Sequence, residues 1–174
     1  MIQRPGSDEY AAFYAGYIGR VPGGANLMDL LAGQAGELRE LLDSTSEAHA
    51  STRPAPKEWS IKEVVGHLCD TERVFAYRAL RIARADQTPL AGFDQDEYVG
   101  ATNFNNRPLA ELIEEFRFQR QANVLCFKAL TDSETARLGT ASGNPVSVRA
   151  LLYMLAGHVI HHIVSLKTDY KIRG

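Results

Sequence analysis

The chain has 174 residues, of which 45% are hydrophobic, so it is long enough to bury one sizeable core and short for two domains. Nineteen Lys and Arg against 21 Asp and Glu give a net charge of −2, and neither sign forms a long run, which argues against a nucleic-acid or anionic-membrane surface. The first residues lack an apolar signal core, and no stretch approaches the length of a membrane span, so we expect a soluble, cytoplasmic protein.

Residues 1–24 are predicted to form an N-terminal extension with one short helix. Ser7 is a suitable N-cap, and two acidic residues follow it in the first turn, where the helix dipole favours negative charge. We therefore expect a helix from Ser7 to about Tyr17, ended by the glycine-rich stretch that follows. The sequence leaves open whether this extension packs over one end of the main domain, residues 25–172, or helps to form a dimer.

Two long helices are predicted in the first half of the main domain. The first spans about Asn26 to Asp43, with Asn26 as N-cap and leucines at helical spacing along one face. The second begins at a capping box, in which the Ser60 hydroxyl and the Glu63 carboxylate satisfy each other's unpaired backbone donors, and it runs to about Arg84.

Two further long helices follow a long connection from Ala85 to Arg107. The third helix has Pro108 at its first turn, and the fourth opens after Pro145 with Ser147 as its N-cap. The connection is long enough to return across the length of a bundle, so the second and third helices can run parallel to each other.

Four amphipathic helices and no convincing strand alternation predict an all-α protein. We expect a four-helix bundle with a long crossover between the second and third helices, plus the short N-terminal helix. The crossover contains the polar and aromatic stretch Asp94 to Tyr98, our candidate for a lid over a functional site, because long loops are often functional. Cys69 and Cys126 fall in different helices and are expected to be free thiols.

The histidines of the fourth predicted helix give the strongest chemical signal. His158 and His162 are four residues apart, so their rings project from one helix face; a helical wheel puts His162 inside the apolar stripe and His158 on its edge. His161 falls off the stripe. We expect it to lie beside the residues that bind a metal, at a dimer contact or in solvent. Two histidines at this spacing can bind one divalent ion with a third ligand from another helix. The alternative is a pair of hydrogen-bonded core histidines.

Two histidines remain as candidates for the third ligand. His49 lies in a polar stretch and is interpreted as a solvated loop residue, whereas His67 flanks the apolar stripe of the second helix, as a site between helices requires. The alternative for His67 is a half-buried ring bonded to a carbonyl. Asp70 could be a further ligand, a base for a metal-bound water or a surface carboxylate, and Thr71 could bond within the site.

Charged and polar side chains also fall within the apolar stripes. Glu72 lies in the stripe of the second helix, and Arg120 and Asn123 lie in that of the third. Because an isolated buried charge costs several kcal/mol, we predict that Glu72 and Arg120 meet, or that each pairs with an equivalent partner such as Arg78. The alternative is that the stripes are narrower and both side chains extend to water.

The segment Trp59 to Glu72 (WSIKEVVGHLCDTE), followed by Arg78, and the segment Ala156 to His162 (AGHVIHH) resemble the DinB/YfiT-like superfamily of small metal-binding four-helix bundles. The similarity extends from about Asn26 to Lys171. It implies a divalent metal, usually nickel or zinc, held by three histidines. It also implies a homodimer, since members of the family are frequently dimeric. Members of the family include thiol-dependent S-transferases and isomerases that use bacillithiol or mycothiol, and others regarded as metal-dependent hydrolases.

In the family the metal-binding histidines match His67, His158 and His162, so we expect a metalloenzyme with an open position for water or substrate on the metal. The metal would lower the pKa of bound water or of a low-molecular-weight thiol, giving hydrolysis or S-transfer, and the family analogy slightly favours transfer. The expected partner is a small-molecule substrate, such as that thiol, rather than nucleic acid or a membrane. The alternative is a non-catalytic binding or stress-response module whose histidines only stabilise the fold.

Overall fold

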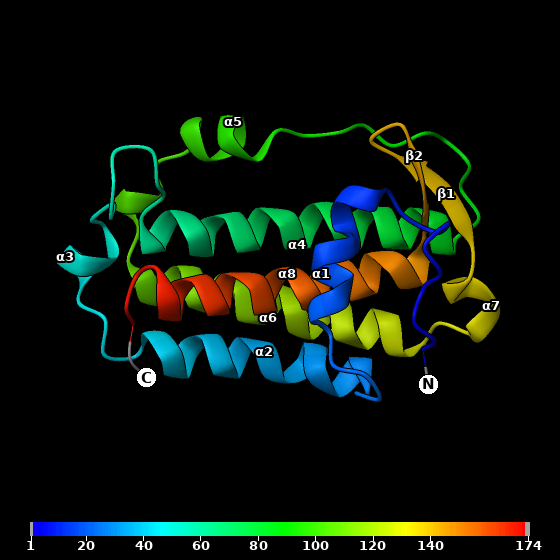
Figure 1. Ribbon diagram of the computed structural model, residues 1–174, viewed down its shortest axis with the longest axis horizontal. Helices are drawn as coiled ribbons and strands as arrows, with labels where there is room; N and C mark the ends of the chain where they lie inside the picture. The colour runs from blue at the N-terminus through cyan, green and yellow to red at the C-terminus, as the bar shows by residue number, and fades with distance from the viewer. Residues whose placement is uncertain (1, 173–174) are drawn as a thin grey trace.

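The computed structural model describes residues 2–172, so residue 1 of the predicted extension lies outside the described residues. Four long helices form a bundle (Figure 1): α2 (Leu27–Leu42), α4 (Ile61–Ala83), α6 (Leu109–Lys128) and α8 (Val148–Thr168). The shorter elements are η1 (Ala12–Tyr14), α1 (Ala15–Arg20), α3 (Glu47–Ala50), α5 (Gln95–Gly100), η2 (Phe104–Asn106), α7 (Asp132–Thr135), β1 (Leu138–Ala141) and β2 (Asn144–Ser147). The predicted all-α four-helix bundle is confirmed.

Local capping sets the starts of the long helices as predicted. The side chains of Asn26, Ser60 and Ser147 each accept a backbone hydrogen bond in the first turn of α2, α4 and α8. At α4 the capping box is complete, because the Glu63 carboxylate also accepts a hydrogen bond of 2.7 Å from the backbone nitrogen of Ser60. Pro108 precedes α6. These contacts satisfy donors that a helix start would otherwise leave unpaired.

Helices α4 and α6 run parallel, as the long crossover suggested. Cys69 lies against the Leu112 carbonyl near the start of both helices, and Glu72 meets Arg120 further along both. Helices α2 and α8 run in the opposite direction, and the chain between α4 and α6, which carries α5, returns along the outside of α4 (Figure 1). Cys69 and Cys126 are both free, as predicted.

The buried charge pair predicted between the second and third long helices is formed. Arg120 donates to the Glu72 carboxylate through Nε at 3.0 Å and Nη2 at 2.8 Å, and both side chains are 1% exposed. Asn123 donates to the same carboxylate at 2.8 Å, and Arg120 Nη1 donates to Gln34 at 2.6 Å. Gln34 in turn donates to the carbonyl of Ala156. This network joins all four long helices, and it ends two residues before His158.

The short hairpin between α7 and α8 was not predicted from the sequence and adds a small two-stranded sheet to the helical bundle. β1 and β2 pair antiparallel around Ser142 and Gly143, whose φ angles of 51° and 74° are those of a two-residue hairpin turn. Each strand has only four residues, too few for an alternating pattern to stand out. The Ser-Gly pair was the one local signal for it.

The N-terminal helix begins later than predicted. The expected start at Ser7 is replaced by a turn in which the backbone nitrogen of Glu9 donates to the carbonyl of Gly6 at 3.1 Å. The Glu9 carboxylate accepts a hydrogen bond of 2.7 Å from Arg149 of α8. The acidic residue that suggested a helix start therefore binds the extension to the bundle instead.

Replacing Glu9 with glutamine should weaken the folded state in a pH-dependent way. Hydrogen bonds from Arg149 are the main reason why the pKa of Glu9 falls from 4.5 to about 2. A carboxylate with a lowered pKa stabilises the folded state above its unfolded pKa, and this contribution is lost as the pH falls towards the folded value. We expect Glu9→Gln to lower the melting temperature at neutral pH and to have little effect near pH 2. Melting temperatures that differ equally at both pH values would contradict this, and Asp8→Asn at an exposed neighbour is the control.

Helix α8 is the core helix of the bundle. By length and composition it is the one helix within residues 2–172 that would be capable of crossing a membrane. However, 72% of its most apolar window is buried within the protein. Burial of this kind is typical of a helix surrounded by other helices in a core.

Candidate metal centre

His67, His158 and His162 meet between α4 and α8. Nε2 of His158 lies 2.9 Å from Nε2 of His67 and 3.1 Å from Nε2 of His162. The three side chains are 3%, 4% and 9% exposed, in the order His67, His158, His162. The structure therefore brings together, as one cluster (the triad), the three histidines that the sequence singled out.

The donor atoms of the triad fit a divalent ion. Zinc binds histidine nitrogens at about 2.0–2.1 Å in tetrahedral geometry, which separates two ligand nitrogens by about 3.3 Å. The two observed separations are only a few tenths of an ångström shorter. Burial lowers the pKa of His67 to about 4 and takes the pKa values of His158 and His162 well below their ordinary range. At neutral pH all three rings are thus uncharged, the form that binds metals.

The rings cannot satisfy one another by hydrogen bonds alone. A neutral imidazole nitrogen carries either one proton or one lone pair, and Nε2 of His158 faces two other ring nitrogens at once. Its single proton or lone pair must then be shared between both neighbours, so at most one of the two contacts can be a well-directed hydrogen bond. A cation that accepts one lone pair from each ring removes this conflict, which supports a metal ion bound between the three histidines.

Neighbouring side chains hold the rings in place. Thr71 Oγ1 lies 3.4 Å from Nδ1 of His67, one turn along α4, which confirms the contact predicted for Thr71. A proton on that Nδ1 leaves the lone pair on Nε2, directed at the other two histidines. The Trp59 ring packs on His67 with centroids 4.8 Å apart, and Tyr17 packs edge-on against His158 at 5.3 Å.

The other sequence candidates lie outside the triad. His161 is half-buried, with its ring 5.0 Å from that of His162, and His49 is exposed on α3. Asp70 is partly exposed and lies 3.9 Å from Arg73. Of the three roles considered for Asp70, a surface carboxylate fits this position.

The N-terminal extension forms one wall of the site, a position that the sequence left open. A Cβ atom on Gly157 would lie 1.9 Å from the carbonyl oxygen of Tyr17, so α1 crosses α8 in backbone contact at this residue (Figure 1). This contact brings the Tyr17 ring next to His158 and His161. In the sequence, Gly157 next to the candidate ligand His158 was the one local signal that another segment of the chain comes close to α8 here.

Replacing Gly157 with alanine should therefore displace α1. The added methyl group has no space, and overpacking of this kind costs about 1–3 kcal/mol of unfolding free energy. We expect faster proteolysis within residues 15–20, because α1 is pushed from α8. Gly33→Ala on α2, where no atom lies within 4 Å of the new methyl, is the matched control. Equal stability and equal proteolysis of the two variants would contradict the close approach.

Two cavities reach the triad. One has a volume of about 260 Å³ and reaches His67 and His158, and the other has about 240 Å³ and reaches His162. Gln95 and Asp96, in the first turn of α5, line both cavities. The beginning of the predicted lid thus borders the site from outside the bundle.

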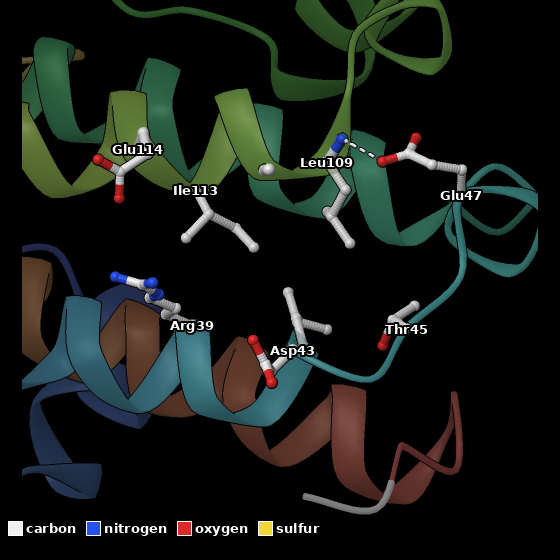
Figure 2. Close-up of a pocket in the computed structure, with 9 residues that line it drawn as sticks. Arg39, Asp43, Thr45, Glu47, Leu109, Ile113 and Glu114 are labelled. Carbon is white, nitrogen blue, oxygen red and sulfur yellow. Dashed lines mark hydrogen bonds between the residues drawn. The ribbon is translucent and has the colours of Figure 1, made fainter.

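Larger cavities lie away from the triad. Figure 2 shows one of about 350 Å³, where Arg39 of α2 and Asp43, which follows the end of α2, face Leu109 and Ile113 of α6. Glu47 at its end accepts a hydrogen bond of 2.9 Å from the backbone nitrogen of Leu109. No histidine or cysteine lines this cavity. We therefore assign the candidate chemistry to the triad rather than to this cavity.

Known proteins share this fold. A sequence profile of the DinB superfamily matches residues 30–164, and no curated protein matches significantly. YfiT from Bacillus subtilis, described as a probable metal-dependent hydrolase with an unusual four-helix bundle topology, aligns with a TM-score of 0.76 and 15% identity over 95% of both chains. A mycothiol-dependent maleylpyruvate isomerase aligns with a TM-score of 0.66 and 13% identity, over 80% of this chain and 59% of its own length. At such low sequence identities, these structural alignments show a shared fold and no more.

Proposed function

Because the chain belongs to the DinB superfamily, we propose that it is a metal-dependent enzyme in which His67, His158 and His162 bind one divalent ion, nickel or zinc. The observation that carries this proposal is the convergence of three buried, uncharged imidazole nitrogens on one place. Within residues 2–172 no carboxylate or thiolate joins the cluster, so protein ligands do not fill a tetrahedral site.

A bound divalent ion would act as a Lewis acid and lower the pKa of a bound water or small thiol, so that the bound group loses its proton at neutral pH. Thr71 orients the His67 ring, Trp59 packs against His67, and Tyr17 packs against His158. Neither cysteine lines the two cavities that reach the histidines. A thiol nucleophile must therefore arrive as a substrate, in an S-transfer or isomerisation, whereas a water nucleophile gives hydrolysis of a carbonyl compound.

A structural role for the metal is the second candidate. The almost complete burial of the triad favours it, since a buried ion can stabilise a fold without reacting. The two cavities that reach the histidines favour catalysis, because they give a small molecule access.

Metal content and turnover separate these candidates. Protein purified without a histidine tag is expected to hold about one equivalent of divalent metal, measured by plasma mass spectrometry. Metal-dependent cleavage of a chromogenic ester supports hydrolysis, and metal-dependent conjugation of a chromogenic electrophile to a small thiol supports transfer. Metal that raises the melting temperature without any turnover supports the structural role. Absence of bound metal after incubation with nickel or zinc would overturn the proposal.

The family resemblance and the composition support three further expectations. We propose that the protein is a homodimer, that it acts on small molecules and that it is cytoplasmic. Light scattering coupled to size exclusion tests the first of these directly, because a monomer mass would contradict it.

A further inference from the structure

We propose that the cavity next to His67 and His158 is an aromatic subsite, which selects substrates that carry a flat, uncharged ring beside the reacting group. This inference rests on the proposed function, since the ring is useful there only if chemistry occurs at the triad. Five aromatic side chains from separate parts of the chain line the cavity: Phe13, Tyr14, Tyr17, Phe75 and Phe93.

The rings of this subsite contact one another edge-on rather than face to face. Phe13 meets Tyr14 edge-on, with centroids 5.2 Å apart at 83°, and Tyr14 meets Phe75 edge-on at 6.0 Å and 80°. Tyr17 also presents an edge to His158. In an edge-on pair the edge of one ring covers one face of the other, and Arg78 lies over the rings of Phe75 and Phe93, so the faces opposite these contacts are the ones that a flat ligand can reach.

Phe13 is exposed at the rim of this cavity. This side chain is 77% exposed, although it sits on a segment that Gly157 and Arg149 hold against α8 beside the triad. One exposed apolar side chain is ordinary on a protein surface, but Phe13 adjoins Tyr14 and Tyr17 at the same cavity, so the three rings form a small apolar patch there. A ring bound in the cavity would cover part of it.

The charges around the cavity favour an uncharged ring. Among residues 2–172 no Lys or Arg lines it, and the charged residues that do are Asp94 and Asp96. Arg78 lies behind the rings, 5.6 Å from the centroid of Phe93, but its guanidinium donates to the Ala91 carbonyl and to Ser142. A charged group on the side of the ring away from the metal would therefore meet two carboxylates and no lysine or arginine.

The size of the cavity suits one ring. An apolar cavity of about 150 Å³ is sufficient to bind benzene. The cavity here has about 260 Å³, which leaves room for a substituent that reaches the histidines. Aromatic side chains line one part of the cavity, and polar side chains such as Thr71 and Gln95 line the rest, so a single benzene ring with a polar substituent fits it.

Two hydroxamates test the subsite separately from the metal. Acetohydroxamate and benzohydroxamate bind a metal through the same hydroxamate group. The first carries a methyl group and the second a phenyl group. By calorimetry on metal-loaded protein, we expect benzohydroxamate to bind about tenfold more tightly. Phe13→Ala, and the double variant Phe13→Ala with Phe93→Ala, should remove this preference and leave acetohydroxamate binding unchanged. Phe118→Ala, at a 60% exposed ring on α6, is the control.

The two proposals fail in different ways. Equal binding of both hydroxamates, or a preference unchanged in the Phe13 and Phe93 variants, overturns the subsite while the metal centre stands. 4-Carboxybenzohydroxamate should bind more weakly than benzohydroxamate, and tighter binding overturns the selection for an uncharged ring. If no metal is retained, the proposed function fails. Saturation-transfer NMR with benzyl alcohol on metal-free protein then decides the subsite: a signal lost in Phe13→Ala supports it, and no signal overturns it.

Discussion

Replacing His158 with alanine is expected to abolish metal binding. Nε2 of this residue lies within 3.1 Å of the corresponding nitrogen of both other histidines, so its removal takes away the central donor of the triad. The affinity for nickel or zinc should fall by more than the roughly ten- to hundredfold loss typical when a residue that only orients a ligand is removed. Equilibrium dialysis followed by metal analysis measures this, and circular dichroism checks that the variant folds.

Two other histidines supply matched controls for this variant. His49 is exposed on α3, so His49→Ala should bind metal like the unaltered protein. His161 lies next to His162 in the chain but outside the triad, and His161→Ala should also retain the metal. A His158→Ala protein with unaltered metal content, or an equal loss in the His49 variant, would contradict the assignment of the triad.

Replacing Arg120 with leucine should destabilise the fold by about 3–5 kcal/mol, the usual cost of removing one partner from a buried ion pair. The Glu72 carboxylate is 1% exposed and would keep only the hydrogen bond from Asn123. Urea unfolding measures the loss. Glu72→Met combined with Arg120→Met should recover part of it, because no unpaired charge then remains in the core.

A second arginine on the same helix is the control for this experiment. Arg117 pairs with Glu114 at 2.7 Å, one turn away, at a more exposed position. Such pairs contribute at most about 1 kcal/mol, so Arg117→Leu should have a small effect. If Arg120→Leu cost no more than Arg117→Leu, the buried network would not stabilise the fold.

The long helices and the candidate site could be predicted because they depend on local patterns. Asn26, Ser60 and Ser147 cap helices through backbone groups two or three residues away, and the spacing of His158 and His162 is a property of one helix. The pairing of Glu72 with Arg120 followed from the high cost of burying either charge alone.

The features that were not predicted depend on contacts between distant parts of the chain. Ser7 has the local properties of an N-cap, but Glu9 bonds to Arg149, which is 140 residues away, and the turn that this requires replaces the helix start. The place of α1 depends on backbone contact between Tyr17 and Gly157. No periodic pattern in the sequence encodes either contact.

The triad has a consequence for the order in which the protein matures. His67 precedes His158 by 91 residues, so a ribosome completes the triad only when α8 has emerged. Until then α4 has a histidine in a groove that lacks its partners. A ligand that binds only the native state stabilises it in proportion to the logarithm of its concentration. Supply of metal during synthesis would thus select chains in which the C-terminal helix has docked, and a truncated product would lack this stabilisation.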